Sequence, residues 1–236
     1  MRQLFREHLS RVPAMSDFNK LPPDRQRFLQ AMDKHTQSHK DIPEPALWSV
    51  MKSNKSSTIA EQCRRWISDA QRYGTHIQGR VGHGTQNLGT RNVNIWCYEE
   101  EKLIEAVKGM MWDFNERSNW QLKLSDIETP QFCVYYGDKQ SHYTWHKDCR
   151  NFLHPELGER KISMSMLLNS SDEFEGGDLE ILDGISTNGK PLISRPKLED
   201  PGDVVFFRSD QFHRVKPVTK GTRAALVVWC WGKGNF

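Results

Sequence analysis

Three side chains in the C-terminal half of the sequence have the types and spacing of a metal site. His146 and Asp148 are one residue apart in a segment that we predict to be a β-strand. Alternate side chains of a strand point to the same face, so the imidazole and the carboxylate should project into one interior, with Lys147 pointing away. His213, on a later predicted strand, is the candidate third ligand. Two histidines and one carboxylate would leave three coordination positions of a metal open for other ligands.

An arginine follows this set in the sequence. Arg223 lies ten residues after His213 and opens the apolar segment 223–229. Burying an arginine without an anionic partner is costly, and its planar guanidinium can bind a carboxylate through two parallel hydrogen bonds. We therefore expect Arg223 to bind the carboxylate of a small acid next to the metal. The alternative is an internal salt bridge with Asp or Glu, which the presence of the two histidines and the aspartate disfavours.

Two helices are predicted ahead of these residues. The first begins at Thr58, because Thr58 and Glu61 have the spacing of a capping box, and it ends at Gly74. The second covers residues 100–114, where apolar side chains recur on one helical face. This face should pack against a sheet.

From residue 121 onward the hydrophobic period changes to two, which predicts a series of β-strands. Turn residues separate the apolar runs, and the predicted strands are 129–137, 143–149, 161–168, 178–182, 203–207, 212–217 and 223–231. Many short strands without helices between them indicate a β-sandwich or a barrel.

The length of 236 residues predicts one domain with an appendage: a polar N-terminal appendage over residues 1–45 and a domain over residues 46–236. The formal net charge of +3 argues against a strongly basic nucleic-acid-binding domain. The five cysteines form no C-x-x-C pair, which argues against a disulfide framework or a cysteine zinc site and favours a reducing compartment. No apolar run approaches the roughly 20 residues of a membrane span. We therefore expect a cytoplasmic protein without membrane contact.

The segments named above resemble, in the same order, those of the prolyl 4-hydroxylase-like branch of the 2-oxoglutarate- and iron(II)-dependent dioxygenases. The likeness spans about residues 48–236 and is strongest over 131–232. The segments that carry it are 136–148, 160–169, 175–179, 201–207, 213–218 and 221–223. In one respect the chain differs from many relatives, which place a hydroxyl-bearing residue where this chain has Leu167; Ser163 or Ser165 could take over that role.

The resemblance implies an α+β, mainly β fold, with a double-stranded β-helix (jelly roll) core and flanking helices. It implies iron(II) at the two histidines and the aspartate, 2-oxoglutarate as co-substrate and ascorbate as an accessory reductant. Zinc, cobalt, nickel and manganese also bind such ligands, so iron rests on the resemblance and on the arginine. By resemblance, Arg223 binds the far carboxylate of the co-substrate, Tyr136 hydrogen-bonds the co-substrate, and Trp229 lies near it or packs in the core.

The implied activity is hydroxylation coupled to decarboxylation of 2-oxoglutarate to succinate. The resemblance favours a peptide or protein residue as the substrate, with proline as the first candidate. Two alternatives stay open: an oxygenase acting on nucleic-acid bases, suggested by basic residues within 52–80 and by the aromatic content, and a non-catalytic binding module. The modest net charge counts against the first alternative, and the complete ligand set with Arg223 counts against the second.

Overall fold

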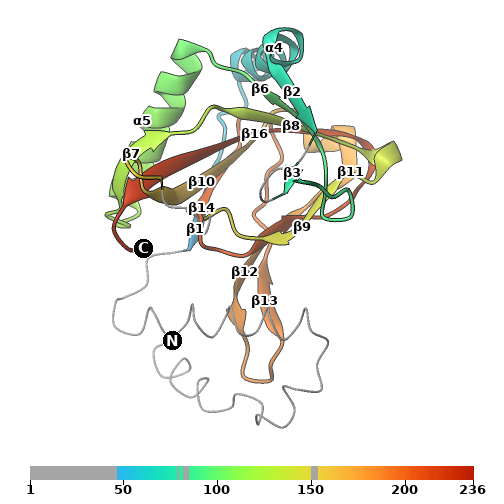
Figure 1. Cartoon of the computed structure of the whole chain (residues 1–236). Coiled ribbons are helices and arrows are strands. Elements are labelled where there is room, and N and C mark those ends of the chain that lie inside the picture. The colour runs from blue at the N-terminus through green and yellow to red at the C-terminus, as the bar shows by residue number, and fades with distance from the viewer. Residues whose placement is uncertain (1–46, 79, 82–84, 150–153) are drawn as a thin grey trace. The chain divides into compact units, whose positions relative to one another are not determined.

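The computed structural model describes residues 47–78, 80–81, 85–149 and 154–236 (Figure 1). The predicted N-terminal appendage, residues 1–45, lies outside the described residues, so the predicted domain boundary stays a prediction. Two antiparallel sheets form the core of the described chain. Side chains from both sheets share one buried apolar cluster, which includes Cys133 and Phe207 from the larger sheet and Ile181 and Val215 from the smaller one.

The larger sheet has nine strands. Its main path, in spatial order, is β1 (Trp48–Met51), β14 (Val204–Arg208), β10 (Glu159–Leu167), β16 (Val218–Lys233), β8 (Gln131–Tyr136), β6 (Asn94–Cys97) and β2 (Thr75–Gln78). Two further strands, β7 (Lys123–Ile127) and β11 (Phe174–Gly176), also pair with β16. The 16-residue strand β16 therefore holds β10, β8, β7 and β11 together.

The smaller sheet has five strands. Their order is β13 (Pro191–Ser194), β12 (Leu179–Ile185), β15 (His213–Val215), β9 (His142–His146) and β5 (Arg91–Asn92). Residues 182–194 cluster as a compact unit distinct from 46–181 and 195–236, and inside that unit Ser194 hydrogen-bonds Asp183. A separate two-stranded pair joins β3 (Arg80–Val81) and β4 (Thr85–Gln86).

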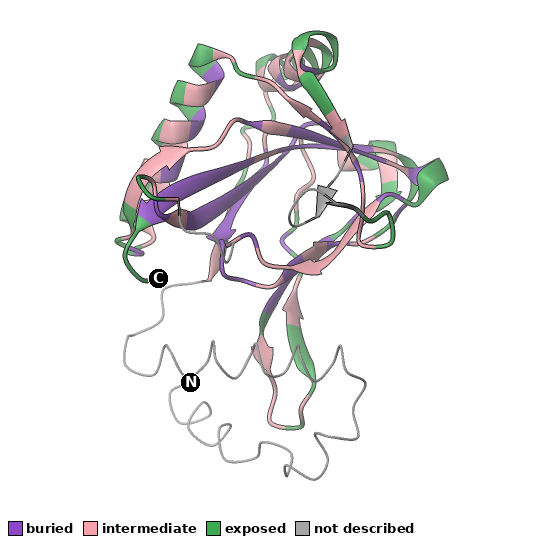
Figure 2. Ribbon diagram, viewed as in Figure 1, coloured by how far each residue is buried: buried purple, intermediate pink, exposed green. Residues whose placement is uncertain are grey.

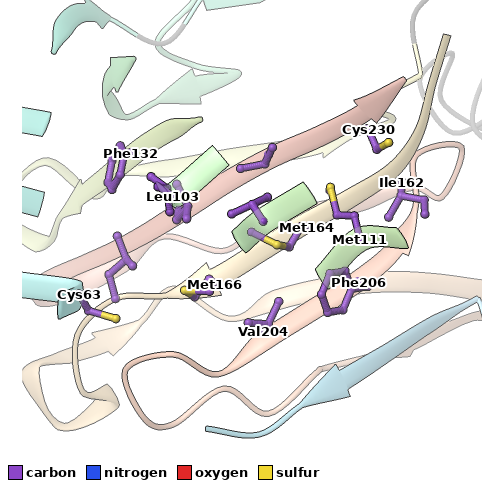
Figure 3. Packing of buried hydrophobic residues seen from close by; sticks show 14 of the residues in the cluster. Cys63, Leu103, Met111, Phe132, Ile162, Met164, Met166, Val204, Phe206 and Cys230 are labelled. Atoms are coloured by element: carbon purple, nitrogen blue, oxygen red, sulfur yellow. The ribbon is translucent and has the colours of Figure 1, made fainter. Parts of the chain in front are cut away.

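Two helices cover the outer face of the larger sheet, α4 (Ser57–Tyr73) and α5 (Glu101–Arg117) (Figure 1). On β16 the residues with even numbers from Ala224 to Cys230 face these helices and are buried. Leu103 and Met111 of α5 pack among them, together with Met164 of β10 (Figure 3). Burial follows the same division, because the central strands are buried while the helices expose their outer sides (Figure 2). The odd-numbered residues of the stretch 223–229 lie on the opposite face, where Val227 packs in the cluster between the sheets.

The predicted start of the first helix was wrong by a short distance. Ser56 caps α4, because its side chain accepts a hydrogen bond from the Ile59 amide (3.2 Å), and Thr58 lies inside the helix. Serine is as good a helix N-cap as threonine, and Ser56, two residues before the predicted cap, accepts the hydrogen bond of a first-turn amide. The capping-box spacing alone therefore gave the wrong start. The predicted end at Gly74 is confirmed. The second helix runs to Arg117, three residues beyond its predicted end.

All seven predicted strands are present with shifted ends, and the prediction of a jelly-roll core with flanking helices is confirmed. The short strands β1, β2, β7 and β11 were not predicted, because segments of three to five residues show too little alternation to be recognised. Within the described part of the chain, no helix has the length and apolarity that crossing a membrane requires.

We expect Leu226→Ala to lower the free energy of unfolding by about 2–5 kcal/mol, because this fully buried side chain lies at the centre of the helix-facing cluster. Urea denaturation followed by circular dichroism measures the change. Leu88→Ala is the control, since Leu88 is 49% exposed and its truncation should shift stability by no more than about 0.5 kcal/mol. Equal small shifts for both variants would contradict the assigned core.

Candidate functional site

The structure brings His146, Asp148 and His213 together. The Nε2 atom of His146 lies 3.5 Å from one carboxylate oxygen of Asp148, and the Nε2 atom of His213 lies 3.3 Å from the other. Each residue offers one ligand atom, and these three atoms lie within 4.8 Å of one another. The pairing of β9 with β15 places the two histidines directly opposite each other. The two imidazole nitrogens and the carboxylate therefore converge on one point between the sheets.

Backbone carbonyl groups fix the orientation of both imidazoles. The Nδ1–H group of His146 donates to the carbonyl oxygen of Thr144 (2.7 Å), and that of His213 donates to the carbonyl oxygen of Gln211 (3.0 Å). These hydrogen bonds leave each Nε2 lone pair available to a metal. Burial, reinforced by the nearby His213, lowers the pKa of His146 to about 4. The imidazole of His146 is therefore neutral at neutral pH, as a metal ligand must be.

The sequence predicted Asp148 inside a strand, but in the structure it lies just beyond the end of β9. Its backbone amide donates to the carbonyl oxygen of Ser209 (2.9 Å), which holds the turn against β14. The hydroxyl of Ser163 donates to its carboxylate (2.7 Å) and also contacts the hydroxyl of Ser209 (2.9 Å). Burial by itself would raise the pKa of Asp148, but His213 and His146 outweigh it and hold this pKa well below its usual value. The carboxylate is therefore charged and held in place.

Aromatic rings enclose the two histidines. The Tyr143 ring stacks on His146, with ring centroids 3.4 Å apart, and the Phe207 ring meets His213 edge-on at 4.6 Å. The guanidinium of Arg91 lies over the Tyr143 ring, 4.6 Å from its centroid. The donor set fits iron(II) because two imidazoles and one carboxylate, fixed by hydrogen bonds and shielded by aromatic side chains, match the facial ligand set of non-haem iron sites.

Arg223 lies on the inner face of β16 and is 4% exposed. Its guanidinium carbon is 5.5 Å from the centroid of the Tyr135 ring, and burial lowers the pKa of the guanidinium. Among the described residues, no carboxylate lies within ion-pair distance of it, so the internal salt bridge considered from the sequence is not found there. Arg223 instead lines a cavity of about 280 Å³.

Tyr136 does not lie beside Arg223. Strand register pairs Arg223 with Tyr135, so it is Tyr135 that shares the inner face with the arginine. Tyr136 points to the opposite face, where it lines a different cavity of about 260 Å³ together with Ile67 of α4 and Ala224 of β16. The tyrosine that the structure places next to the arginine is therefore the neighbour of the one expected from the sequence.

Trp229 lies on the same inner face of β16 as Arg223, opposite Ser163 of β10. It is 4% exposed, and its buried indole Nε1–H group has no hydrogen-bond partner among the residues that the structure describes. The guanidinium of Arg160 stacks on the indole at 3.8 Å from the ring centroid and is itself held by a two-point ion pair with Glu128. A buried indole N–H usually finds an acceptor, so this one is available to a bound molecule beside the metal ligands.

Sequence reasoning missed several of these residues. Tyr135 could have been found by extending the alternation from Arg223 to its antiparallel neighbour, but only once the strand register was known. Ser163 had been named as a replacement for a missing hydroxyl group, whereas it contacts the metal-binding carboxylate. The ion pair of Arg160 with Glu128 joins two segments that no sequence pattern links.

Comparison with known proteins agrees with this geometry. A family model described as the 2OG-Fe(II) oxygenase superfamily matches residues 130–231. A PKHD-type hydroxylase of Azoarcus sp. (strain BH72) is 37% identical over 158 residues, covering 65% of this chain and 66% of the relative. Another PKHD-type hydroxylase, from Aliarcobacter butzleri (strain RM4018), is 26% identical over 176 residues and covers 71% of each chain. The chain thus spans somewhat less than two thirds of the Azoarcus protein.

Solved structures show the same fold. A prolyl hydroxylase from Trichoplax adhaerens, in complex with a peptide of hypoxia inducible factor, superposes with a TM-score of 0.63 at 14% identity, covering 87% of this chain and 92% of that one. A prolyl-4-hydroxylase from Pseudomonas putida superposes with a TM-score of 0.59 at 18% identity, covering 86% of this chain and 99% of that one. The segment that matches the family model, residues 130–231, contains all three metal-ligand candidates and Arg223.

Proposed function

We propose that this protein is an iron(II)- and 2-oxoglutarate-dependent hydroxylase that acts on a peptide or protein residue, with proline as the first candidate. The observation that carries the proposal is the buried guanidinium of Arg223, which lines a cavity and lies in the same interior as the convergent His146, Asp148 and His213. A buried cation of this kind is stabilised by an anionic ligand, and 2-oxoglutarate brings two carboxylates.

His146, Asp148 and His213 would hold iron(II), and Arg223 would bind the far carboxylate of 2-oxoglutarate. With both bound, the metal and the co-substrate supply the oxidising chemistry that couples decarboxylation to hydroxylation. The protein orients these groups. Tyr135 presents its side chain on the same face as Arg223, and we assign to it the co-substrate hydrogen bond that the sequence had placed at Tyr136.

The space between metal ligands and arginine is bordered by small side chains. Cys133 of β8 and Ala225 of β16 lie opposite each other on the inner face, and Ser165 of β10 is also small. Trp229, opposite Ser163 at the metal end, adds an indole N–H group that has no acceptor in the described ranges. This arrangement supports a bound co-substrate that runs along the inner face from the metal toward Arg223.

A peptide substrate is supported by two buried polar atoms on the inner face of the larger sheet. Within the described part of the chain, the buried side-chain oxygen of Gln131 of β8 has no donor, and the buried N–H group of Trp229 has no acceptor. Gln131 lies opposite Val227, which packs with the interior cluster, so both polar groups belong to the inner face. A peptide group offers one donor and one acceptor, which matches this pair. The prolyl hydroxylase from Trichoplax adhaerens, solved in complex with a peptide, points to the same class of substrate.

The first experiment measures succinate release from the purified protein given iron(II), ascorbate and 2-oxoglutarate, with a panel of proline-containing peptides and of DNA or RNA oligomers. We expect a peptide to stimulate succinate release and to gain one oxygen atom by mass spectrometry. Asp148→Ala should abolish both signals, whereas Arg117→Leu, an exposed change on α5, should leave them intact. Stimulation by an oligonucleotide alone would transfer the proposal to nucleic-acid bases, and unchanged turnover in Asp148→Ala would refute the site.

A matched pair of variants tests the tyrosine assignment. We expect Tyr135→Phe to weaken 2-oxoglutarate binding by about 3- to 10-fold, the effect of losing one hydrogen bond, and Tyr136→Phe to leave it unchanged. Arg223→Leu should weaken binding by about 10- to 100-fold because it removes a charged hydrogen-bond donor. Isothermal titration of 2-oxoglutarate into the metal-loaded protein gives the affinities. Weaker binding in Tyr136→Phe but not in Tyr135→Phe would reverse the assignment.

A second matched pair tests the support of the metal-binding carboxylate. We expect Ser163→Ala to lower the affinity for iron(II) or cobalt(II) by about 10- to 100-fold, because the hydroxyl that orients Asp148 is lost. Ser165→Ala is the control, since Ser165 lies two residues along the same face of β10. Competition with a metallochromic chelator measures both affinities. Equal affinities in the two variants would remove Ser163 from the site.

A further inference from the structure

Arg223 borders an opening that does not pass the metal ligands. The cavity of about 280 Å³ is lined by the buried residues Arg223, Leu167 and Leu179 and by the surface residues Ser171 and Lys197. Neither histidine of the metal centre nor its aspartate lines this cavity. The guanidinium can therefore be reached from solvent by a route separate from the metal ligands.

The backbone at this opening leaves room for a small ligand. Gly177 has a φ of +69°, and a Cβ atom there would lie 2.9 Å from Cδ of Arg223. A side chain at position 177 would therefore displace the arginine stem, so glycine keeps both the turn and the space. The cavity volume approaches the roughly 300–1,000 Å³ of pockets that bind drug-sized molecules, so a five-carbon dicarboxylate fits within it.

Positive charge is concentrated along this route. Arg195 and Lys197 line the opening with side chains 62% and 79% exposed, and Arg223 lies inside. Asp178 is the one carboxylate among the described lining residues. Arg195 and Lys197 also pair with Glu180 and Glu199, so their field is reduced, but the inner charge of Arg223 faces no carboxylate of the described residues at ion-pair distance. An approaching dianion meets increasing attraction toward Arg223.

The other end of the interior has different chemistry. Trp229 lies opposite Ser163, which donates to Asp148, and Gln131 lies opposite Val227 on the neighbouring strand β8. The buried indole N–H group of Trp229 and the buried oxygen of Gln131 have no hydrogen-bond partner among the described residues, so the proposed peptide substrate would bind at this end. A bound macromolecule at that end would obstruct exchange of a small acid past the metal. A separate route at Arg223 would keep exchange open.

We propose that 2-oxoglutarate enters, and succinate leaves, through the opening lined by Ser171, Lys197 and Arg223. This inference rests on the proposed function for the identity of the dicarboxylate. The route makes co-substrate exchange independent of whether the metal end is covered. The residues at the opening affect the rates of binding and release, while Arg223 sets the affinity.

The test is stopped-flow binding of 2-oxoglutarate to the iron(II)-loaded full-length chain without oxygen, followed through the visible absorption that chelation of the metal by a 2-oxo acid produces. We expect Lys197→Glu to slow association by about 3- to 10-fold at low salt, with the difference disappearing at high salt. Ser171→Trp should slow association and dissociation by similar factors and leave the equilibrium affinity near that of the wild type. Arg117→Glu, a charge reversal of similar exposure on α5, and Ser171→Ala are the controls.

The possible outcomes distinguish a failure of the proposed entry route from a failure of the proposed hydroxylase function. Wild-type rates in both Lys197→Glu and Ser171→Trp, with normal binding by the wild-type protein, would overturn the route and leave the hydroxylase proposal standing. A loss of affinity in Ser171→Trp without slower exchange would also overturn it, because that pattern indicates damage to the site. Absence of 2-oxoglutarate binding by the wild-type protein would overturn both proposals. Should Ser171→Trp fail to fold, the salt-dependent rate of Lys197→Glu decides alone.

Discussion

The pairing of β16 with β8 on one side and β10 on the other determines where every other part of the site lies. Residues alternate along this strand, so one set packs under the helices and the other faces the space between the sheets. Leu226 belongs to the first set, while Arg223 and Trp229 belong to the second. A shift of one residue would bury the guanidinium among the apolar side chains of α5 and turn Leu226 into the interior. The requirement that the helix-facing set be apolar therefore fixes the register that also positions the arginine.

The polar groups between the sheets are stabilised in two different ways. Asp148 is compensated within the protein, because two imidazoles and the hydroxyl of Ser163 surround its carboxylate. Arg223 finds no such compensation among the carboxylates of the described residues, and its burial disfavours the charged form. A ligand that supplies the missing negative charge would thus bind the folded chain and stabilise it by mass action. The protein's own side chains thus stabilise the charge at the metal end, whereas the charge of Arg223 would be stabilised by the co-substrate.

The sequence alone predicted the features that depend on residue type and on the order of residues along the chain. The metal-ligand candidates, Arg223 and the strand-rich core all follow from spacing, and the structure brings these residues into one interior. Spacing could not predict on which face of its strand Tyr136 lies, because a period of two defines two faces without saying which one is inside. Tyr135 and Tyr136 are chemically identical, and only pairing with Arg223 separates them. The ion pair between Arg160 and Glu128 depends on three-dimensional proximity that local patterns do not contain.

The position of Leu167 connects the departure from the family pattern with the shape of the interior. Leu167 pairs with Ala225 on the inner face and lines the cavity at Arg223, so a small and an apolar residue occupy the wall beside the guanidinium. A hydroxyl-bearing ring at position 167 would fill part of that cavity and supply a hydrogen bond to the carboxylate. With leucine there, the cavity remains open, and our assignment takes the hydroxyl group from a residue of another strand. That residue is Tyr135, which lies on the inner face on the opposite side of β16 from β10. Leu167 on β10 has no hydroxyl group, whereas Tyr135 on β8 has one. This arrangement is consistent with a single ligand that lies between the two strands, beside β16.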